Sequence, residues 1–140
     1  MEQTYIMVKP HFANFKMVID LVRKEAMSAG MHILREKFVK YDVESAQKHY
    51  REHFRGSYEN AKGFYKELED YITSDKAYGM VMEGVDAISA MRAIIKRLRQ
   101  EIPAMLGEEP RMTENVLHGS DCVESCNNEV AIFDSLPEVR

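Results

Sequence analysis

Short apolar segments alternate with stretches of helical periodicity along most of the chain, and this alternation limits the folds it can adopt. Residues 4–8 are β-branched and aromatic and are soon followed by Pro10, which predicts a first strand. Residues 31–41 and 77–83 predict two more strands. Residues 130–133 read Val-Ala-Ile-Phe, and we expect them to form the last strand.

Apolar residues at helical spacing fill the stretches between these strands. The clearest pattern lies in residues 88–102, where an apolar residue recurs every three or four positions. The same spacing predicts further helices at residues 12–26, 42–53 and 61–72, and a short one from about residue 122. Suitable caps are Gly30, Asp42 and Asp121. Residues 103–110 contain glycine and two prolines, so we expect a loop there.

The order of these elements predicts an α+β fold. A β-α-β-β-α-β core with added helices packs most economically as one antiparallel sheet with helices on one face, the ferredoxin-like arrangement. The chain of 140 residues is long enough for one hydrophobic core. Because the composition does not change along the chain, we expect a single domain over residues 1–140, in which residues 134–140 form a short C-terminal tail.

The composition argues against several classes of partner. The net charge of −4 provides no general attraction for nucleic acid or for a membrane surface. No apolar run approaches the roughly 20 residues of a membrane-spanning helix, and no signal peptide is visible. Cys122 and Cys126 are typical of reduced packing residues, so we expect a cytoplasmic protein. An RNA-binding ferredoxin-like domain is a weaker alternative, because an aromatic RNP1-type strand is missing.

One histidine has surroundings that suggest chemistry. His118 lies in the segment Asn-Val-Leu-His-Gly-Ser-Asp, residues 115–121. We expect a short strand or extended segment, then an exposed imidazole at a turn before a helix start. Phosphate is favoured at such a place, and a neutral imidazole can attack a phosphoryl group. Glu129, on the following helix, is spaced to reach back and fix the tautomer of the ring. The simpler interpretation is a solvated histidine and a solvated carboxylate at a helix end.

Several cationic side chains are candidate phosphate ligands. Lys9 stands at the end of the first strand, and Arg92, Lys96 and Arg99 share one face of the helix predicted at residues 88–102. Guanidinium groups bind phosphate oxygens in a bidentate manner. Without further context, each of these side chains is more simply a solvated charge.

Two other patterns allow more than one interpretation. Residues 49–53 read His-Tyr-Arg-Glu-His, the H-x-x-E-H pattern in which His49 and His53 could bind zinc. The pattern is short, however, and a third ligand would be needed, so helix-face or nucleotide-cleft residues are the simpler interpretation. Phe64 and Tyr65 could pack in the core or stack on a base. Neither G-x-x-x-x-G-K-[ST] nor G-x-G-x-x-G is present, so a nucleotide would have to be held in another way.

Together these segments resemble the nucleoside diphosphate kinases over nearly the whole chain. The most specific match is N-V-L-H-G-S-D-x-V-E-S-x-x-x-E, from Asn115 to Glu129. Individually weaker matches follow the family's order: T-Y-I-M-V-K-P at residues 4–10, His49-Tyr50, Lys62-Gly63-Phe64-Tyr65, and Met82-Glu83-Gly84 with Arg92.

The resemblance implies a ping-pong transfer of the terminal phosphoryl group from a nucleoside triphosphate to a nucleoside diphosphate. It makes His118 the phosphorylated residue and gives it Ser120 and Glu129 as supporting hydrogen-bond partners. The nucleotide ligands that it implies are Lys9, Tyr50, Phe64 under the base, Arg92, and Asn115 at the sugar. It also implies Mg²⁺, held mainly by the nucleotide phosphates, and a homo-oligomer.

The chain departs from the family pattern at four places. His11-Phe12-Ala13 replaces D-G-V, and extra residues lie between Tyr50 and Lys62. Residues 96–100 replace the G-x-T-N-P turn, and the later I-R-G-D-F segment is missing, so that Arg99 or Arg111 is left to substitute for its arginine. These departures motivate an alternative, a catalytically silent nucleotide-binding or assembly module of the same fold.

Overall fold

The secondary structure follows the predicted order up to the C-terminal third of the chain. A computed structural model describes residues 1–54, 62–109 and 116–140, without the side chains of residues 51–54 and 62–64. Its elements are β1 (Glu2–Val8), the short 3-10 helix η1 (Phe12–Asn14), α1 (Lys16–Ser28), β2 (His32–Val39), α2 (Val43–Phe54), α3 (Lys62–Ile72), β3 (Ala77–Gly84), α4 (Ala87–Met105), β4 (Leu117–Gly119) and α5 (Val123–Ser135).

The strands form one antiparallel sheet in the order β2-β3-β1-β4. β1 lies in its interior and pairs with β3 along its whole length, while Met7 lies opposite His118 on the short strand β4. α1 and α4 are the crossover connections, because each joins two strands between which a third, antiparallel strand is inserted. This is the ferredoxin-like topology that the sequence predicted.

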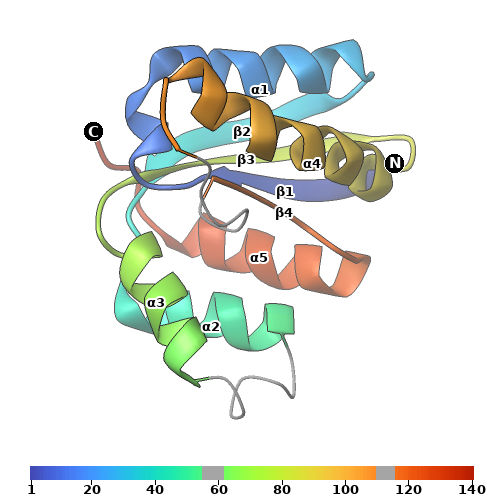
Figure 1. Cartoon of the computed structure of the whole chain (residues 1–140). Coiled ribbons are helices and arrows are strands. Elements are labelled where there is room, and N and C mark those ends of the chain that lie inside the picture. Colours follow the sequence, from blue (N-terminus) through green and yellow to red (C-terminus); the bar gives the residue numbers. More distant parts are fainter. Residues whose placement is uncertain (55–61, 110–115) are drawn as a thin grey trace.

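Helices cover both faces of the sheet, whereas the sequence predicted them on one face (Figure 1). α1 and α4 pack on the face that carries Ile6 and Met80, while α2, α3 and α5 pack on the face that carries Met7 and Val81. The central strands β1 and β3 are buried along most of their lengths, so both of their faces are apolar. An apolar face has to be covered, and the added helices α2 and α3, together with α5, cover the second one.

The prediction of a strand at residues 130–133 was wrong, because these residues belong to α5. Four apolar residues are too few to distinguish a strand from a helix. In α5, Ile132 and Phe133 are buried while Ala131 is exposed, which is a helical pattern. The fourth strand is instead β4, the segment that contains His118. The tail therefore begins after Ser135 and not at Asp134, and α5 begins with Cys122 rather than Asp121 as its N-cap.

The C-terminal tail is bound to the edge strand β2. Lys37 donates a hydrogen bond to the carbonyl of Leu136 at 2.7 Å. The backbone N–H of Val139 donates to the carbonyl of Phe38 at 3.0 Å. At the end of α5, Arg35 binds Asp134 through two hydrogen bonds of 2.8 Å each. The tail thus covers part of the outer edge of β2.

α4 confirms the clearest helical pattern of the sequence. All five residues of its apolar stripe, which ends at Ile102, are buried, and so is Pro103 directly after it. The helix therefore continues to Met105 where a loop was predicted. Its outer face is charged, with Arg92, Lys96 and Arg97 exposed. Within residues 1–54, 62–109 and 116–140, no helix has both the length and the apolar composition needed to cross a bilayer.

Candidate active site

His118 is the middle residue of β4, and its side chain lies between the sheet and the α2–α5 layer. Because Met7 pairs with His118 and faces α5, the imidazole points into the same layer. His118 is only 4% exposed. The prediction of an exposed imidazole at a turn was therefore wrong: the residue is part of the sheet, and helices that were expected on one face only also cover this one.

Glu129 and Ser120 form a hydrogen-bonded network with His118. The Nε2 atom of His118 lies 2.7 Å from Oε2 of Glu129. The hydroxyl of Ser120 donates to Oε1 of the same carboxylate at 2.6 Å and accepts from the backbone N–H of Tyr5 at 3.0 Å. All of these side chains are nearly or fully buried. The carboxylate is thus fixed by His118 on β4 and by Ser120 after it, and Ser120 is in turn held by β1.

This network selects one tautomer of His118. An ionised carboxylate can only accept hydrogen bonds, so the Nε2 atom of a neutral imidazole must carry the proton. The lone pair is then on Nδ1, the nitrogen that a neutral imidazole in this tautomer could use as a nucleophile. Burial of the network strengthens the hydrogen bond because the local dielectric constant is low.

Lys9 and Tyr50 meet on the same face of the sheet. Lys9 follows β1 directly, and its ammonium donates to the hydroxyl of Tyr50 on α2 at 3.2 Å and lies 5.5 Å from the centre of that ring. The Lys9 side chain is 1% exposed, although the sequence suggested a solvated lysine as the simpler interpretation. Both residues therefore belong to the layer that contains His118.

His49 is a member of the site that sequence reasoning did not assign. Its ring lies edge-on to that of His118, with ring centres 4.6 Å apart, and also contacts Tyr50 at 4.8 Å. The residue is fully buried. The sequence indicated His49 only as a zinc ligand together with His53, or more simply as a helix-face or nucleotide-cleft residue, and not as a neighbour of His118. The side chain of His53 lies outside the described residues.

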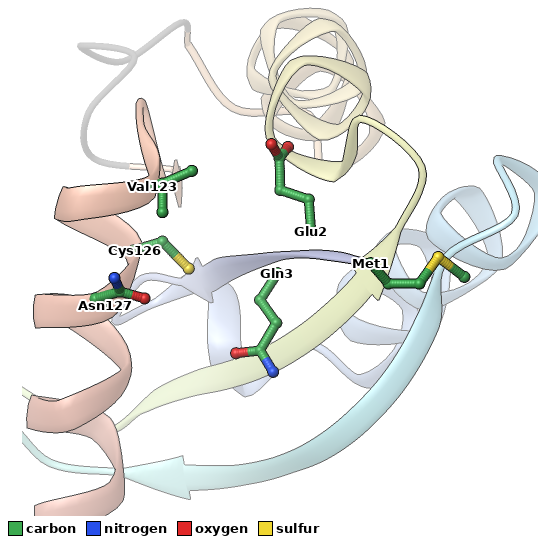
Figure 2. A pocket seen from close by; sticks show the side chains of 6 residues that line it. All are labelled: Met1, Glu2, Gln3, Val123, Cys126 and Asn127. Carbon is green, nitrogen blue, oxygen red and sulfur yellow. The ribbon is translucent and has the colours of Figure 1, made fainter.

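A separate concavity lies at the start of β1 and does not include the site. Its volume is about 380 Å³, and it is bordered by Met1, Glu2, Gln3, Val123, Cys126 and Asn127 (Figure 2). Burial raises the pKa of the Cys126 thiol above its usual value, so the thiol stays protonated at neutral pH and is a poor nucleophile. None of the proposed nucleotide ligands lines this concavity.

The sequence is similar to known proteins over nearly its whole length. The sequence profile described as nucleoside diphosphate kinase matches residues 2–138. The chain belongs to the nucleoside diphosphate kinase family. A nucleoside diphosphate kinase of Listeria monocytogenes is 33% identical, with 99% of this chain and 92% of the relative covered. That of Metallosphaera sedula is 32% identical, with 99% and 96% covered.

Solved structures of nucleoside diphosphate kinases share the fold. The enzyme from Aquifex aeolicus superposes with a TM-score of 0.72 at 26% identity, with 94% of each chain covered. A halophilic enzyme from Halobacterium salinarum, solved in complex with CDP, gives a TM-score of 0.71 at 28% identity, with 99% of this chain and 93% of that chain covered. The likeness thus extends through the whole sheet and its helices.

The arginines suggested by the likeness to nucleoside diphosphate kinases come from the opposite layer. Arg99, on α4, donates two hydrogen bonds of 3.1 and 2.9 Å to the carbonyl of Leu117, directly before His118. Arg92 is exposed on α4 and has no hydrogen-bond or ion-pair partner among the described residues. Since β4 is an edge strand, these guanidinium groups can approach a phosphate near His118 only around that edge.

The remaining expected nucleotide ligands lie outside the described residues. Asn115 and Arg111 precede the described segment that starts at Val116, and the side chain of Phe64 is not described although its backbone is part of α3. Its neighbour Tyr65 is buried in the core of the α2–α5 layer. Tyr65 thus takes the packing role that the sequence left open between the two aromatic residues.

Proposed function

We propose that residues 1–140 form a single, active nucleoside diphosphate kinase domain that transfers a phosphoryl group through a phosphohistidine at His118. The observation that carries the proposal is the 2.7 Å hydrogen bond between Nε2 of His118 and Glu129. It leaves the lone pair on Nδ1, where it can attack phosphorus. A catalytically silent relative would need the same fold to bind a nucleotide, but it would not need this tautomer of His118.

The reaction divides into two opposite halves. Nδ1 forms a bond to the terminal phosphorus of a nucleoside triphosphate while the bond to the bridging oxygen breaks, and the nucleoside diphosphate leaves. A second nucleoside diphosphate then attacks the phosphohistidine and regenerates the imidazole. Because His118 is nearly buried, the side chains that cover it must move apart before a nucleotide can reach Nδ1.

The protein's contribution is positioning and charge neutralisation. We assign Lys9, Tyr50, Arg92 and Arg99 to the phosphates, where the cations offset the charge that develops on the phosphoryl oxygens. Ser120 holds Glu129, and Glu129 holds His118. Phe64 at the base and Asn115 at the sugar complete the proposed ligand set.

Magnesium belongs to this proposal as part of the nucleotide substrate. Mg²⁺ prefers an octahedral shell of oxygen atoms. The buried cluster around His118 offers two imidazoles and one carboxylate, which do not match that preference. We therefore assign the ion to the nucleotide phosphates, and no step depends on a protein-held magnesium.

The partners that we propose are nucleoside tri- and diphosphates and further copies of the same chain. The homo-oligomer rests on the family likeness alone. We propose a cytoplasmic location, consistent with the two free cysteines, and no nucleic acid as a partner, since the net charge is −4.

The decisive experiment separates the two half-reactions. Purified protein is mixed with Mg²⁺ and γ-labelled ATP, freed of nucleotide, and then mixed with GDP. We expect an acid-labile label on the protein that leaves when GDP is added and that His118→Asn lacks. Nucleotide binding without any label would establish the silent module. It would point to the altered residues 96–100 and the missing I-R-G-D-F segment as the cause.

A further inference from the structure

The cluster around His118 also has the composition of a transition-metal site. One ligand atom from each of His49, His118 and Glu129 lies within 4.8 Å of the other two. The three residues are 0%, 4% and 1% exposed. We propose that these residues bind a divalent metal ion of the zinc class, separately from the magnesium that accompanies the nucleotide.

The donor atoms favour this class of ion. Imidazole nitrogen suits Zn²⁺, Co²⁺ and related ions, whereas Mg²⁺ selects oxygen. Three protein ligands with an open fourth position are the usual arrangement of a reactive zinc site. Here they come from α2, β4 and α5, so the site exists only in the folded chain.

The distances require little movement. Bonds to zinc are about 2.0–2.2 Å long, so two ligand atoms in a tetrahedral site lie about 3.3 Å apart. His118 and Glu129 are 2.7 Å apart with a proton between them, and they open slightly when an ion takes the place of that proton. The ligand atom of His49 already lies within 4.8 Å of the other two, and a rotation of its side chain brings it to bonding distance from the ion.

The surroundings hold the ligands in place. The Ser120 hydroxyl donates to the second oxygen of Glu129 at 2.6 Å and thereby orients the carboxylate. The ring of His49 is held between Tyr41 and Tyr50, with centre distances of 5.9 and 4.8 Å. Such outer contacts commonly change metal affinity by about 10- to 100-fold. The ammonium of Lys9, which donates to Tyr50, is a nearby positive charge and repels a bound cation.

The site differs from the zinc pattern in the sequence. The H-x-x-E-H reading pairs His49 with His53 on the same helix. In the folded chain the partners of His49 are instead His118 and Glu129, which are far from it in sequence. This explains how one histidine of a weak sequence pattern can still be a metal ligand.

Metal binding and phosphorylation exclude each other, a consequence that rests on the proposed function. When the ion binds Nε2, the proton of a neutral imidazole moves to Nδ1. Nδ1 then has no lone pair with which to attack phosphorus. A zinc-class ion therefore inactivates Nδ1 of His118 directly and does not compete with the nucleotide for its binding site.

The test of binding does not depend on kinase activity. Chelator-treated full-length protein is titrated with Co²⁺, which absorbs visible light much more strongly in a four- or five-coordinate protein site than in water. We expect one such ion per chain. The variants His49→Gln and Glu129→Gln should each bind at least about tenfold more weakly.

A second histidine–carboxylate pair provides the matched control. His11 lies 2.8 Å from Glu108 and is partly exposed, so His11→Gln removes a similar pair but should leave the strong absorption unchanged. The proposed site would be refuted if His11→Gln lost the strong Co²⁺ absorption, if both His49→Gln and Glu129→Gln kept it, or if the wild type did not show it. If His49→Gln does not fold, Glu129→Gln decides, supported by the rise in melting temperature that Zn²⁺ gives the wild type.

A final experiment tests the exclusion. Protein loaded with Zn²⁺ and freed of excess ion is exposed to labelled ATP, and we expect little label until a chelator is added. Full labelling with Zn²⁺ bound would refute the exclusion. Unlabelled protein both with and without the ion would refute the proposed kinase and leave the Co²⁺ result standing.

Discussion

At the scale of single residues, the orientation of one imidazole controls the proposed chemistry. Three atoms fix it: Oε2 of Glu129, the hydroxyl of Ser120 and the backbone nitrogen of Tyr5. Burial raises the pKa of Tyr5 well above its usual value, so that hydroxyl stays neutral beside the network. The carboxylate therefore acts through its contact with Nε2 and not through a neighbouring phenolate.

Replacing Glu129 by Gln should slow phosphoryl transfer by about a hundredfold or more. The amide can accept or donate, so the tautomer with its lone pair on Nδ1 is no longer selected; a comparable loss of tautomer control in the serine-protease triad costs about 10⁴ in kcat. Single-turnover labelling by γ-labelled ATP measures the rate. The exposed residue Glu124 on the same helix provides the control Glu124→Gln, for which we expect an unchanged rate.

Replacing Tyr50 by Phe should raise KM for the nucleotide severalfold and change kcat little. The variant loses the hydroxyl that holds the Lys9 ammonium at 3.2 Å, and one hydrogen bond contributes about 1 kcal/mol. Steady-state kinetics distinguish the two parameters. Tyr78→Phe serves as the comparison, because Tyr78 bonds to Glu36 in the other layer. A change confined to kcat would contradict this role of Tyr50.

At the scale of elements, the sheet has a helical layer on each face, whereas the sequence predicted helices on one face only. Apolar positions at residues 88–102 correctly predicted α4, and the order of strands and helices correctly predicted an antiparallel ferredoxin-like sheet, although its fourth strand was expected at residues 130–133. The second layer was missed because the short run at residues 130–133 has no resolvable period. With residues 130–133 taken as a strand, the helix expected from about residue 122 was too short to indicate that His118 is covered from this side.

The ion pair between Arg35 on β2 and Asp134 at the end of α5 should give a small, pH-dependent stabilisation. The Arg35 guanidinium holds the pKa of Asp134 below its usual value. The contribution is therefore present above about pH 4, the ordinary carboxyl range, and is lost as the pH falls through the lower folded-state pKa. Because both side chains are about half exposed, Asp134→Asn should cost less than about 1 kcal/mol at pH 7.

Urea unfolding of Asp134→Asn and of the wild type at a series of pH values measures this effect. The difference between the two proteins should shrink as the solution is acidified below about pH 4. A difference that stays constant down to acid pH would mean that the charge of Asp134 is not its cause.

At the scale of the whole molecule, the distance between the α2–α5 layer and the sheet depends on a residue without a side chain. A Cβ atom at Gly79 of β3 would lie 2.5 Å from Cε1 of Phe133 and 2.7 Å from the hydroxyl of Tyr5. Both rings are buried, and Tyr5 also donates its backbone N–H to Ser120. Packing at Gly79 is thereby connected to the network that holds His118.

Gly79→Ala should lower the free energy of unfolding by about 1–3 kcal/mol, the usual range for overpacking a core. Denaturant unfolding provides the measurement. The double variant Gly79→Ala with Phe133→Leu should recover part of the loss, because the smaller side chain makes room for the added methyl group. Strictly additive losses would show that the two positions do not compete for the same space.

The sequence indicated which residues belong to the candidate site, but not how they are arranged in space. Lys9, Tyr50, Ser120, His118 and Glu129 were each singled out, and the structure places them in one layer, while their roles stay predictions. The pairing of Met7 with His118 that aligns them is a property of the sheet and leaves no local pattern. His49 was missed for the same reason, since its contact with His118 joins residues far apart in the chain.

Gly119, directly after the histidine, has a further consequence for variation of this chain. A Cβ atom at this position would collide with the terminal methyl group of Ile95 on α4, on the opposite side of β4 from the imidazole. Position 119 can therefore accept a side chain only if position 95 becomes smaller. In a library that randomises both positions, functional clones should pair a larger residue at one position with a smaller residue at the other, because the two side chains share the space behind His118.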